Sequence, residues 1–490
     1  MVLNPNFNDS LFDQAKPLFT PETIINHVEE LIKQAEPIPH AQILARLLDR
    51  VNTLDFRELA ELEEAEKLNN SHLQIITVEQ VLNLAKLNKW GICRNHDFIY
   101  LYNGAYWSLF DVEELKAFLG EAAEKMGVDK FKARYFQFRE TLFKQFLTLA
   151  NLPKPEQPKE VVLVNLKNGT FEISPTGHRL RPFDRSDFIT YQLPFEYNPE
   201  AEAPLFTAYL NKVLPDQERQ KVLAEYLGYV FIKNGTIKEE KVLFLYGTGA
   251  NGKSVFHEVV KALLGAENTS QYSLQDLTND NGYYRAMIAN KLVNYASEIS
   301  GKLEAATFKQ LASGETVSAR LPYGNPMQIS DYARLIFNVN DLPRDVEQTD
   351  AFFRRFLIVP FDVTIPEAEQ DKQLHIKIIE NELSGVFNWV LQGLNRLLSQ
   401  KQFTNCQAAH DAREHYKTQS DSVKMFIEEN GYKNSPTEYR LIKELYQEYR
   451  NFCIDDGFKP VNKSNFIKRL QGFGVPIEKK NIGNVAFIAR

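Results

Sequence analysis

The residues with the clearest chemical potential form a glycine-rich segment, 247–254, with the spacing G-x-x-x-x-G-K-S. An apolar stretch at 241–246 precedes it, and a stretch with helical character follows at 255–260. Between a strand and a helix, backbone N–H groups and the helix N-terminus can surround phosphates. Lys253 is then expected to reach the β- and γ-phosphates, and the Ser254 hydroxyl to bind Mg²⁺. The segment therefore predicts binding of a nucleoside triphosphate, ATP, with Mg²⁺.

Every residue of this segment is a candidate nucleotide contact. The candidates are Gly247, Thr248, Gly249, Ala250, Asn251, Gly252, Lys253 and Ser254.

Two polar residues end later apolar stretches. Glu298 ends the stretch 292–298, where a carboxylate can hold hydrated Mg²⁺ or polarise the attacking water. Asn340 follows the stretch 334–339, where its amide can position that water or sense the γ-phosphate. The structural alternatives are an acid in a surface loop and a turn-forming Asn before Asp341. We expect Glu298 and Asn340 to be catalytic, with Glu298 also a metal ligand beside Ser254.

Two arginines, Arg354 and Arg355, interrupt an otherwise apolar run at 350–361. A guanidinium held by a packed element can reach the γ-phosphate of a neighbouring subunit as an arginine finger. For one of the pair, an ordinary arginine at a domain surface is the alternative. The pair predicts a nucleotide site completed by a second copy of the chain.

The elements that must position these residues indicate a multidomain α/β protein. Apolar runs at 241–246, 291–296 and 334–339 predict parallel buried strands of a P-loop ATPase core. Helical spacing is expected at 21–86, 206–233 and 373–400, and strand–Asn-Gly–strand hairpins at 98–107 and 161–173. Residues 423–490 have the helix, helix, helix, hairpin order of a winged-helix domain.

Composition limits the class of protein. The chain has 490 residues, 43% of them hydrophobic and 25% charged, with a net charge of −7 and three widely spaced cysteines. This predicts several soluble domains and argues against zinc sites, disulfides and uniform nucleic-acid coating. Without a signal or membrane-spanning segment, we expect a cytoplasmic protein that does not enter membranes. The basic segment 459–490 has seven basic residues and one acid.

The order of residues 247–254, Glu298, Asn340 and Arg354/Arg355 resembles the superfamily 3 helicases, specifically the phage, plasmid and poxvirus primase–helicase family with satellite-phage members. The resemblance covers about residues 95–490 and implies an AAA+-like core followed by a winged helix. Two departures matter. Ser297 stands where that family often has a second carboxylate. Residues 1–94 show no counterpart of the primase domain of longer relatives, so primer synthesis is not expected.

By resemblance, the segment 308–326 contains a pore hairpin that contacts single-stranded DNA through Lys309, Arg320 and Tyr323. Cations that contact the phosphate backbone and an aromatic ring that stacks on the bases suit sequence-independent binding of single-stranded DNA. Lys463, Lys468 and Arg469 of the winged helix are candidate duplex or origin contacts, with a solvated basic tail as the alternative.

The resemblance implies an ATP-dependent replicative DNA helicase of a phage, plasmid or other mobile element. It implies a homo-oligomeric ring, a hexamer by analogy, moving 3′ to 5′ on single-stranded and forked DNA. The rival interpretations are an ATP-switched origin-binding initiator that does not unwind DNA, and a small-molecule or nucleotide kinase.

Four domains are expected: a helical module at 1–94, an α+β domain at 95–205, a helical collar with the ATPase core at 206–400, and a linker with the winged helix at 401–490. The first is a candidate for recruiting a primase, polymerase or host replication protein.

Overall fold

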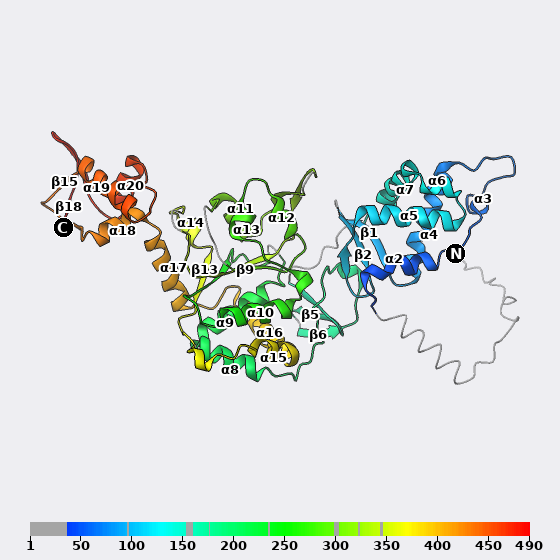
Figure 1. Cartoon of the computed structure of the whole chain (residues 1–490), viewed down its shortest axis with the longest axis horizontal. Coiled ribbons are helices and arrows are strands. Elements are labelled where there is room, and N and C mark those ends of the chain that lie inside the picture. Colours follow the sequence, from blue (N-terminus) through cyan, green and yellow to red (C-terminus); the bar gives the residue numbers. More distant parts are fainter. Residues whose placement is uncertain are drawn as a thin grey trace, which may run out of the picture. The chain divides into compact units, whose positions relative to one another are not determined.

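The computed structural model describes residues 37–95, 98–152, 160–175, 177–233, 236–297, 303–321, 324–343 and 346–490 (Figure 1). These residues form two compact units. The first lies within residues 37–152 and takes in Phe183–Thr190, and the second comprises residues from 160 to 182 and Tyr191–Arg490. The expected division into four domains stays a prediction.

The first unit is mainly helical, as expected for its first half, with a small antiparallel sheet. Its helices are α2 (His40–Asp49), α3 (Phe56–Leu59), α4 (Asn70–Leu87), α5 (Val112–Met126), α6 (Lys130–Arg134) and α7 (Phe136–Leu149). Its sheet has the order β1 (Gly91–Asn95), β2 (Phe98–Tyr102) and β3 (Trp107–Leu109). The Asn103 side chain accepts the N–H groups of Ala105 and Tyr106 at 3.0 Å, which fixes the predicted Asn-Gly turn.

The second unit begins with an antiparallel sheet, β4 (Val162–Leu166), β5 (Gly169–Ser174) and β6 (Gly177–Arg181). The pair β4–β5 is the second predicted hairpin. The helical stretch expected at 206–233 is two helices, α8 (Pro204–Val213) and α9 (Gln217–Tyr229). They separate at Pro215, which has no N–H to continue a helix, and the Asp216 carboxylate caps α9 by accepting the N–H of Glu218.

A five-stranded sheet forms the centre of the second unit. Its order is β13 (Phe356–Pro360), β7 (Val242–Tyr246), β12 (Arg334–Val339), β9 (Val293–Ser297) and β8 (Thr269–Ser270). Every neighbouring pair is parallel, as the three apolar runs predicted. Along β7, Leu243 and Leu245 enter one apolar core, whereas Val242 and Phe244 enter another. The sheet is therefore buried on both faces, which explains why these strands read as continuous apolar runs.

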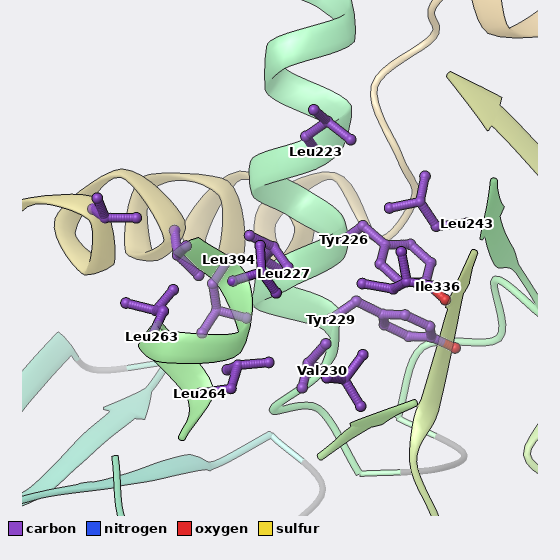
Figure 2. Packing of buried hydrophobic residues seen from close by; sticks show 14 of the residues in the cluster. Leu223, Tyr226, Leu227, Tyr229, Val230, Leu243, Leu263, Leu264, Ile336 and Leu394 are labelled. Carbon is purple, nitrogen blue, oxygen red and sulfur yellow. The ribbon is translucent and has the colours of Figure 1, made fainter. Parts of the chain in front are cut away.

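Helices from distant parts of the sequence cover the first of these faces. They are α8, α9, α10 (Lys253–Leu264), α15 (Leu374–Asn381) and α16 (Leu383–Gln400). Figure 2 shows Tyr226 and Tyr229 of α9 beside Leu243 and Ile336 of the sheet. The Tyr226 hydroxyl donates to the Leu335 carbonyl at 2.7 Å. Where α9 crosses α16, a Cβ on Gly393 would lie 2.2 Å from the Ala224 backbone, so this close approach requires glycine.

The opposite face carries α11 (Leu274–Thr278), α12 (Tyr283–Met287), α13 (Ala305–Ser313), α14 (Asp350–Phe353) and α17 (Gln407–Gln419). The hairpin β10 (Val317–Arg320) and β11 (Pro326–Ile329) follows α13 at the position predicted for the DNA-contacting hairpin.

The C-terminal elements have the predicted order of three helices and a hairpin. The helices are α18 (Ser422–Glu429), α19 (Ile442–Asp455) and α20 (Lys463–Gly472). The hairpin is β16 (Ile477–Lys480) and β17 (Gly483–Ala486), and β15 (Arg440–Leu441) pairs with β17. A separate antiparallel pair is formed by β14 (Lys433–Asn434) and β18 (Ile488–Ala489). Phe426, Tyr449 and Phe466 meet in its core. Within the described part of the chain, no helix is both long and apolar enough to cross a membrane.

Candidate nucleotide and nucleic-acid site

The predicted phosphate loop, residues 247–254, joins the end of β7 to the start of α10. Gly249 and Gly252 have φ values of +115° and +86°, and Ala250 has +48°, so the backbone turns through the left-handed region three times. A Cβ on Gly247 would lie 2.2 Å from the Asn251 amide nitrogen. The sequence therefore places glycine where the backbone needs it, in a loop of the kind whose N–H groups can surround an anion.

The chain that follows β13 braces this loop from one side. The Asn251 side chain donates to the Phe361 carbonyl at 3.1 Å, and the Ile365 N–H donates to the Ala250 carbonyl at 2.8 Å. The loop is thus held before any ligand enters, a condition for binding phosphate without reordering the backbone.

Lys253 and Asn340, which are 87 positions apart in the sequence, meet at this loop. The Lys253 ammonium donates to the Gly247 carbonyl at 2.5 Å, to Asn251 Oδ1 at 3.1 Å and to Asn340 Oδ1 at 3.4 Å. Burial lowers the pKa of Lys253. A desolvated cation among carbonyl and amide oxygens is a favourable partner for a phosphate, whose charge far exceeds that of these acceptors.

A cavity of about 590 Å³ opens beside these residues. Its polar side includes Lys253, Ser254, Ser297 and Asn340, and its apolar side includes Val213, Ile365 and Leu374. This volume lies in the range of small-molecule and cofactor sites. The cation, the exposed hydroxyl of Ser254 and the loop N–H groups fit a nucleoside triphosphate with a divalent cation.

Glu298, the predicted catalytic acid and metal ligand, lies outside the described residues. Its neighbour Ser297 is the last residue of β9 and lines the cavity. Strand β12, which ends next to Asn340, lies between β7 and β9. The Tyr295 hydroxyl joins β9 to β12 by donating to Asn338 Oδ1 at 2.9 Å.

Arg354 and Arg355, although adjacent, have very different surroundings. The Arg355 side chain is 8% exposed and donates to Ser313 Oγ at 2.9 Å, to the Lys309 carbonyl at 3.2 Å and to the Ala351 carbonyl. The Arg354 side chain is 59% exposed and pairs with the Glu240 carboxylate at 2.8 Å. Glu240 also lies 3.2 Å from Arg355. The buried guanidinium ties α13 and α14 together, whereas the exposed one reaches towards solvent.

The candidate DNA contacts of the second unit have varied surroundings. Lys309 lies on α13, outside the hairpin, and makes an ion pair with Glu347 at 2.9 Å. Arg320 is the last residue of β10, is exposed, and donates to the Gly324 carbonyl at 3.0 Å. Tyr323 lies outside the described residues.

Among the C-terminal candidates, Lys463 and Lys468 are exposed on α20. Arg469 is half-buried and pairs with Asp421 at 3.0 Å, where the Asp421 carboxylate also accepts the N–H groups that begin α18. A DNA contact by any of these three residues stays a prediction.

Sequence reasoning missed residues that reach the loop from other elements. The Tyr209 hydroxyl of α8 donates to the Gly252 carbonyl at 2.8 Å, and burial raises its pKa. Ile365 and Leu374 supply the apolar wall. No local pattern marks them, because each is an apolar or aromatic residue of the kind found in any core, and only the tertiary fold brings it to the loop.

Two families match separate parts of the chain. A family described as "D5 N terminal like" matches residues 80–215, and a "Family of unknown function (DUF5906)" matches residues 245–355. The second match contains the phosphate loop, Asn340 and Arg354.

The chain is also similar to two viral proteins. "Putative helicase 121R" of Invertebrate iridescent virus 3 is 22% identical over 358 residues, which cover 63% of this chain and 37% of that protein. "Putative helicase L207/L206" of Acanthamoeba polyphaga mimivirus is 24% identical over 214 residues, which cover 41% of this chain and 22% of that protein. The chain therefore spans well under half the length of either relative.

One solved structure with partial similarity is "The A form apo structure of NrS-1 C terminal region-CTR". It has a TM-score of 0.45 and 13% identity, and the match covers 86% of this chain and 99% of that chain.

The two family matches and the viral relatives, both named putative helicases, confirm the predicted resemblance to the superfamily 3 helicases of the phage, plasmid and poxvirus primase–helicase family.

Proposed function

We propose that this protein is an ATP-dependent replicative DNA helicase that works as a ring-shaped oligomer. By resemblance, the ring is a hexamer, moves 3′ to 5′ on single-stranded DNA, and serves a phage, plasmid or other mobile element. The two viral relatives are named helicases, which supports the same activity here.

The observation that carries the proposal is the place of Arg354 relative to the phosphate loop. Strands β7 and β13 are parallel, with Val242 opposite Phe356 and Tyr246 opposite Pro360. The phosphate loop follows the carboxyl end of β7, whereas Arg354 comes just before the amino end of β13. The loop and Arg354 therefore lie at opposite ends of two neighbouring strands, about 16 Å apart along the strand direction. An arginine finger from this position must therefore act on a second copy of the chain.

The contacts also favour Arg354 over Arg355 as the finger. Arg355 is saturated by carbonyls and Ser313 of its own chain, so its withdrawal would leave buried acceptors without donors. Arg354 can leave Glu240 more easily, because its own side chain is 59% exposed and Glu240 keeps its 3.2 Å contact with Arg355. We assign Arg354 as the residue supplied in trans and Arg355 as its support.

In the proposed mechanism, Lys253 would hold the β- and γ-phosphates and Ser254 would hold Mg²⁺, which would supply positive charge to offset that of the phosphates. Glu298 polarises the attacking water. Asn340 contacts Lys253 and directly follows β12, the strand between β7 and β9, so it can sense loss of the γ-phosphate. The resulting movement would reach the β10–β11 hairpin, with Arg320 and Tyr323 gripping the strand.

Two finer features of fold support the proposal. A strand, β12, inserted between the phosphate-loop strand and the strand that leads to the acid is consistent with an AAA+-like core. The three helices and the hairpin at the C-terminus, with Lys463 and Lys468 exposed on the third helix, are consistent with a winged helix that contacts duplex or origin DNA.

Strand displacement tests the proposal. Two forks, one with only a 3′ tail and one with only a 5′ tail, are incubated with ATP and the wild-type, Lys253→Ala or Arg354→Ala protein. We expect unwinding of the 3′-tailed fork alone, and none with either variant. ATP hydrolysis without displacement of either fork would contradict the helicase and favour the ATP-switched initiator. Hydrolysis that is independent of protein concentration and of DNA would favour a kinase-like enzyme.

A further inference from the structure

Three exposed aromatic residues lie close together in the sequence of the first unit, where α6 meets α7. Phe131 on α6 is 81% exposed, Tyr135 between the helices is 50% exposed, and Phe136 at the start of α7 is 64% exposed. The rings of Tyr135 and Phe136 are 5.0 Å apart in an edge-to-face arrangement. We call Phe131, Tyr135 and Phe136 the aromatic corner; α6 and α7 are labelled in Figure 1.

The local fold requires these rings to face solvent. The Asp129 carboxylate accepts the Lys132 N–H and begins α6, and Tyr135, with φ −68° and ψ +129°, ends it one residue before α7 starts. The two short helices bury other residues, namely Ala133 of α6 and Phe138, Leu142 and Phe146 of α7. The aromatic corner therefore contributes little to the core, although large aromatics are normally among the most buried side chains.

The surroundings of the aromatic corner are basic. Between positions 125 and 144, six residues are basic and two are acidic, in a chain whose net charge is −7. The basic residues are Lys125, Lys130, Lys132, Arg134, Arg139 and Lys144, and the acidic ones are Asp129 and Glu140.

Several of these charges have partners. Asp129 caps α6, Glu140 pairs with Lys116 at 2.6 Å, and Arg134 pairs with Glu124 at 2.8 Å. Lys130 and Lys144 are exposed, and Lys132 lies 5.7 Å from the Phe138 ring. Both acids between positions 125 and 144 are thus engaged, and this stretch presents Lys130 and Lys144 to solvent.

We propose that the aromatic corner binds single-stranded DNA, by stacking bases on its rings while the adjacent lysines contact the backbone. Exposed aromatic faces with neighbouring cations are the combination that sequence-independent binding of single strands uses. A duplex keeps its bases stacked on one another, so it offers nothing for Tyr135 or Phe136 to cover. Lysine is depleted in protein–protein interfaces, so the lysines of this stretch favour nucleic acid over a protein partner.

The choice of DNA over RNA rests on the proposed helicase function, but binding at the aromatic corner does not require ATP hydrolysis. An experiment can therefore contradict the helicase function without contradicting DNA binding at the aromatic corner, and the reverse.

Binding is measured with the full-length protein and fluorescent oligothymidylate, without nucleotide. We expect the combined change Tyr135→Ala and Phe136→Ala to weaken binding about tenfold or more, because a stacked base is worth about that factor. Tyr135→Phe should keep wild-type affinity, since the ring remains. Lys130→Gln with Lys144→Gln should reduce the slope of log affinity against log salt by about 0.7 for each phosphate that the lysines no longer neutralise.

The matched control is Leu87→Ala, because Leu87 is 82% exposed in the same unit but offers no ring on which a base can stack. It should leave DNA binding unchanged. Far-UV circular dichroism and the thermal midpoint verify that each variant is folded, as expected for exposed positions.

Cross-linking locates the contact, because the hairpin of the second unit also has candidate DNA contacts. Oligonucleotides with 5-iodouracil should cross-link to the peptide that contains Phe131, Tyr135 and Phe136, both in the wild type and in Lys253→Ala. Wild-type affinity in the double alanine variant together with cross-links elsewhere would overturn the inference and favour a protein partner. Stronger binding of oligouridylate than of oligothymidylate would overturn the assignment to DNA. Failure of strand displacement with these cross-links intact would overturn the helicase alone.

Discussion

At the scale of single residues, the neighbouring arginines give the sharpest separation of roles. Arg354→Ala should reduce ATP hydrolysis about a thousandfold while leaving the free energy of unfolding nearly unchanged, because its side chain is exposed. Arg355→Ala should instead destabilise the protein by on the order of 3 kcal/mol, because it removes a buried guanidinium with several acceptors. Steady-state hydrolysis and urea unfolding measure the two effects.

Arg354→Lys is the control for charge, since lysine keeps the positive charge but lacks the planar fork of donors. It should remain inactive in hydrolysis if the fork contacts the γ-phosphate. Full stability of Arg355→Ala together with wild-type activity of Arg354→Ala would reverse the assignment.

The lowered pKa of Lys253 makes nucleotide affinity depend on pH. Burial disfavours the charged ammonium in the empty site. The charged side chain therefore destabilises the folded protein at pH values below the lowered pKa, and this destabilisation is relieved as pH rises through that pKa. Bound phosphates favour the charged form and raise the pKa again. The affinity for a non-hydrolysable ATP analogue should therefore fall as pH rises from the lowered pKa towards about 10.4, the ordinary lysine value.

Titration of the analogue at several pH values measures this dependence, and binding in buffers of different ionisation enthalpy measures the accompanying proton uptake. Lys253→Arg should bind with little pH dependence, because arginine stays charged. The same affinity for the wild type across the alkaline range would contradict a shifted pKa.

At the scale of elements, helix α8 supports the phosphate loop through one hydroxyl. Tyr209→Phe removes the hydrogen bond to the Gly252 carbonyl, in a loop whose φ at Gly252 is +86°. We expect a loss of about 1 kcal/mol in the free energy of unfolding and a rise in KM for ATP larger than the fall in kcat. Urea unfolding and steady-state kinetics on one preparation provide both values.

Tyr191→Phe is the matched control, because the buried Tyr191 hydroxyl also donates to a backbone carbonyl, that of Leu163 at 2.9 Å, with no contact to the loop. It should cost a similar stability without changing KM. Equal effects of both substitutions on KM would show that Tyr209 acts only through general stability.

The same scale explains how much of the protein is predictable from sequence. The phosphate loop, the three long apolar strands and both Asn-Gly hairpins follow from patterns within about a dozen residues. The order of the strands does not follow from such patterns, because contacts between strands that are distant in sequence place β12 between β7 and β9. Strand β8 has two residues, too few for any periodic signal.

The candidate site shows the same limit. Lys253 was predictable from its own motif, whereas the difference between Arg354 and Arg355 depends on Glu240, which is 114 positions from Arg354 in sequence. The helix expected at 373–400 divides at Glu382, whose carboxylate accepts the N–H groups of Leu205 and Phe206 at 3.0 and 2.9 Å. Local spacing cannot reveal that a distant helix start requires this acid.

At the scale of the whole molecule, the separation of Arg354 from its own phosphate loop predicts complementation between inactive subunits. Lys253→Ala lacks a working loop but keeps its arginine, and Arg354→Ala has the opposite defect. In a head-to-tail ring formed from an equal mixture, about a quarter of the interfaces combine an intact loop with an intact arginine. ATP hydrolysis of the mixture should therefore approach that fraction of wild-type activity, although each variant alone is nearly inactive. The measurement is steady-state hydrolysis at a subunit concentration that favours assembly, with subunits mixed before and after assembly. Each variant alone, treated in the same way, is the baseline. No gain of the mixture above this baseline would place the arginine and the loop in the same subunit, against the geometry of β7 and β13.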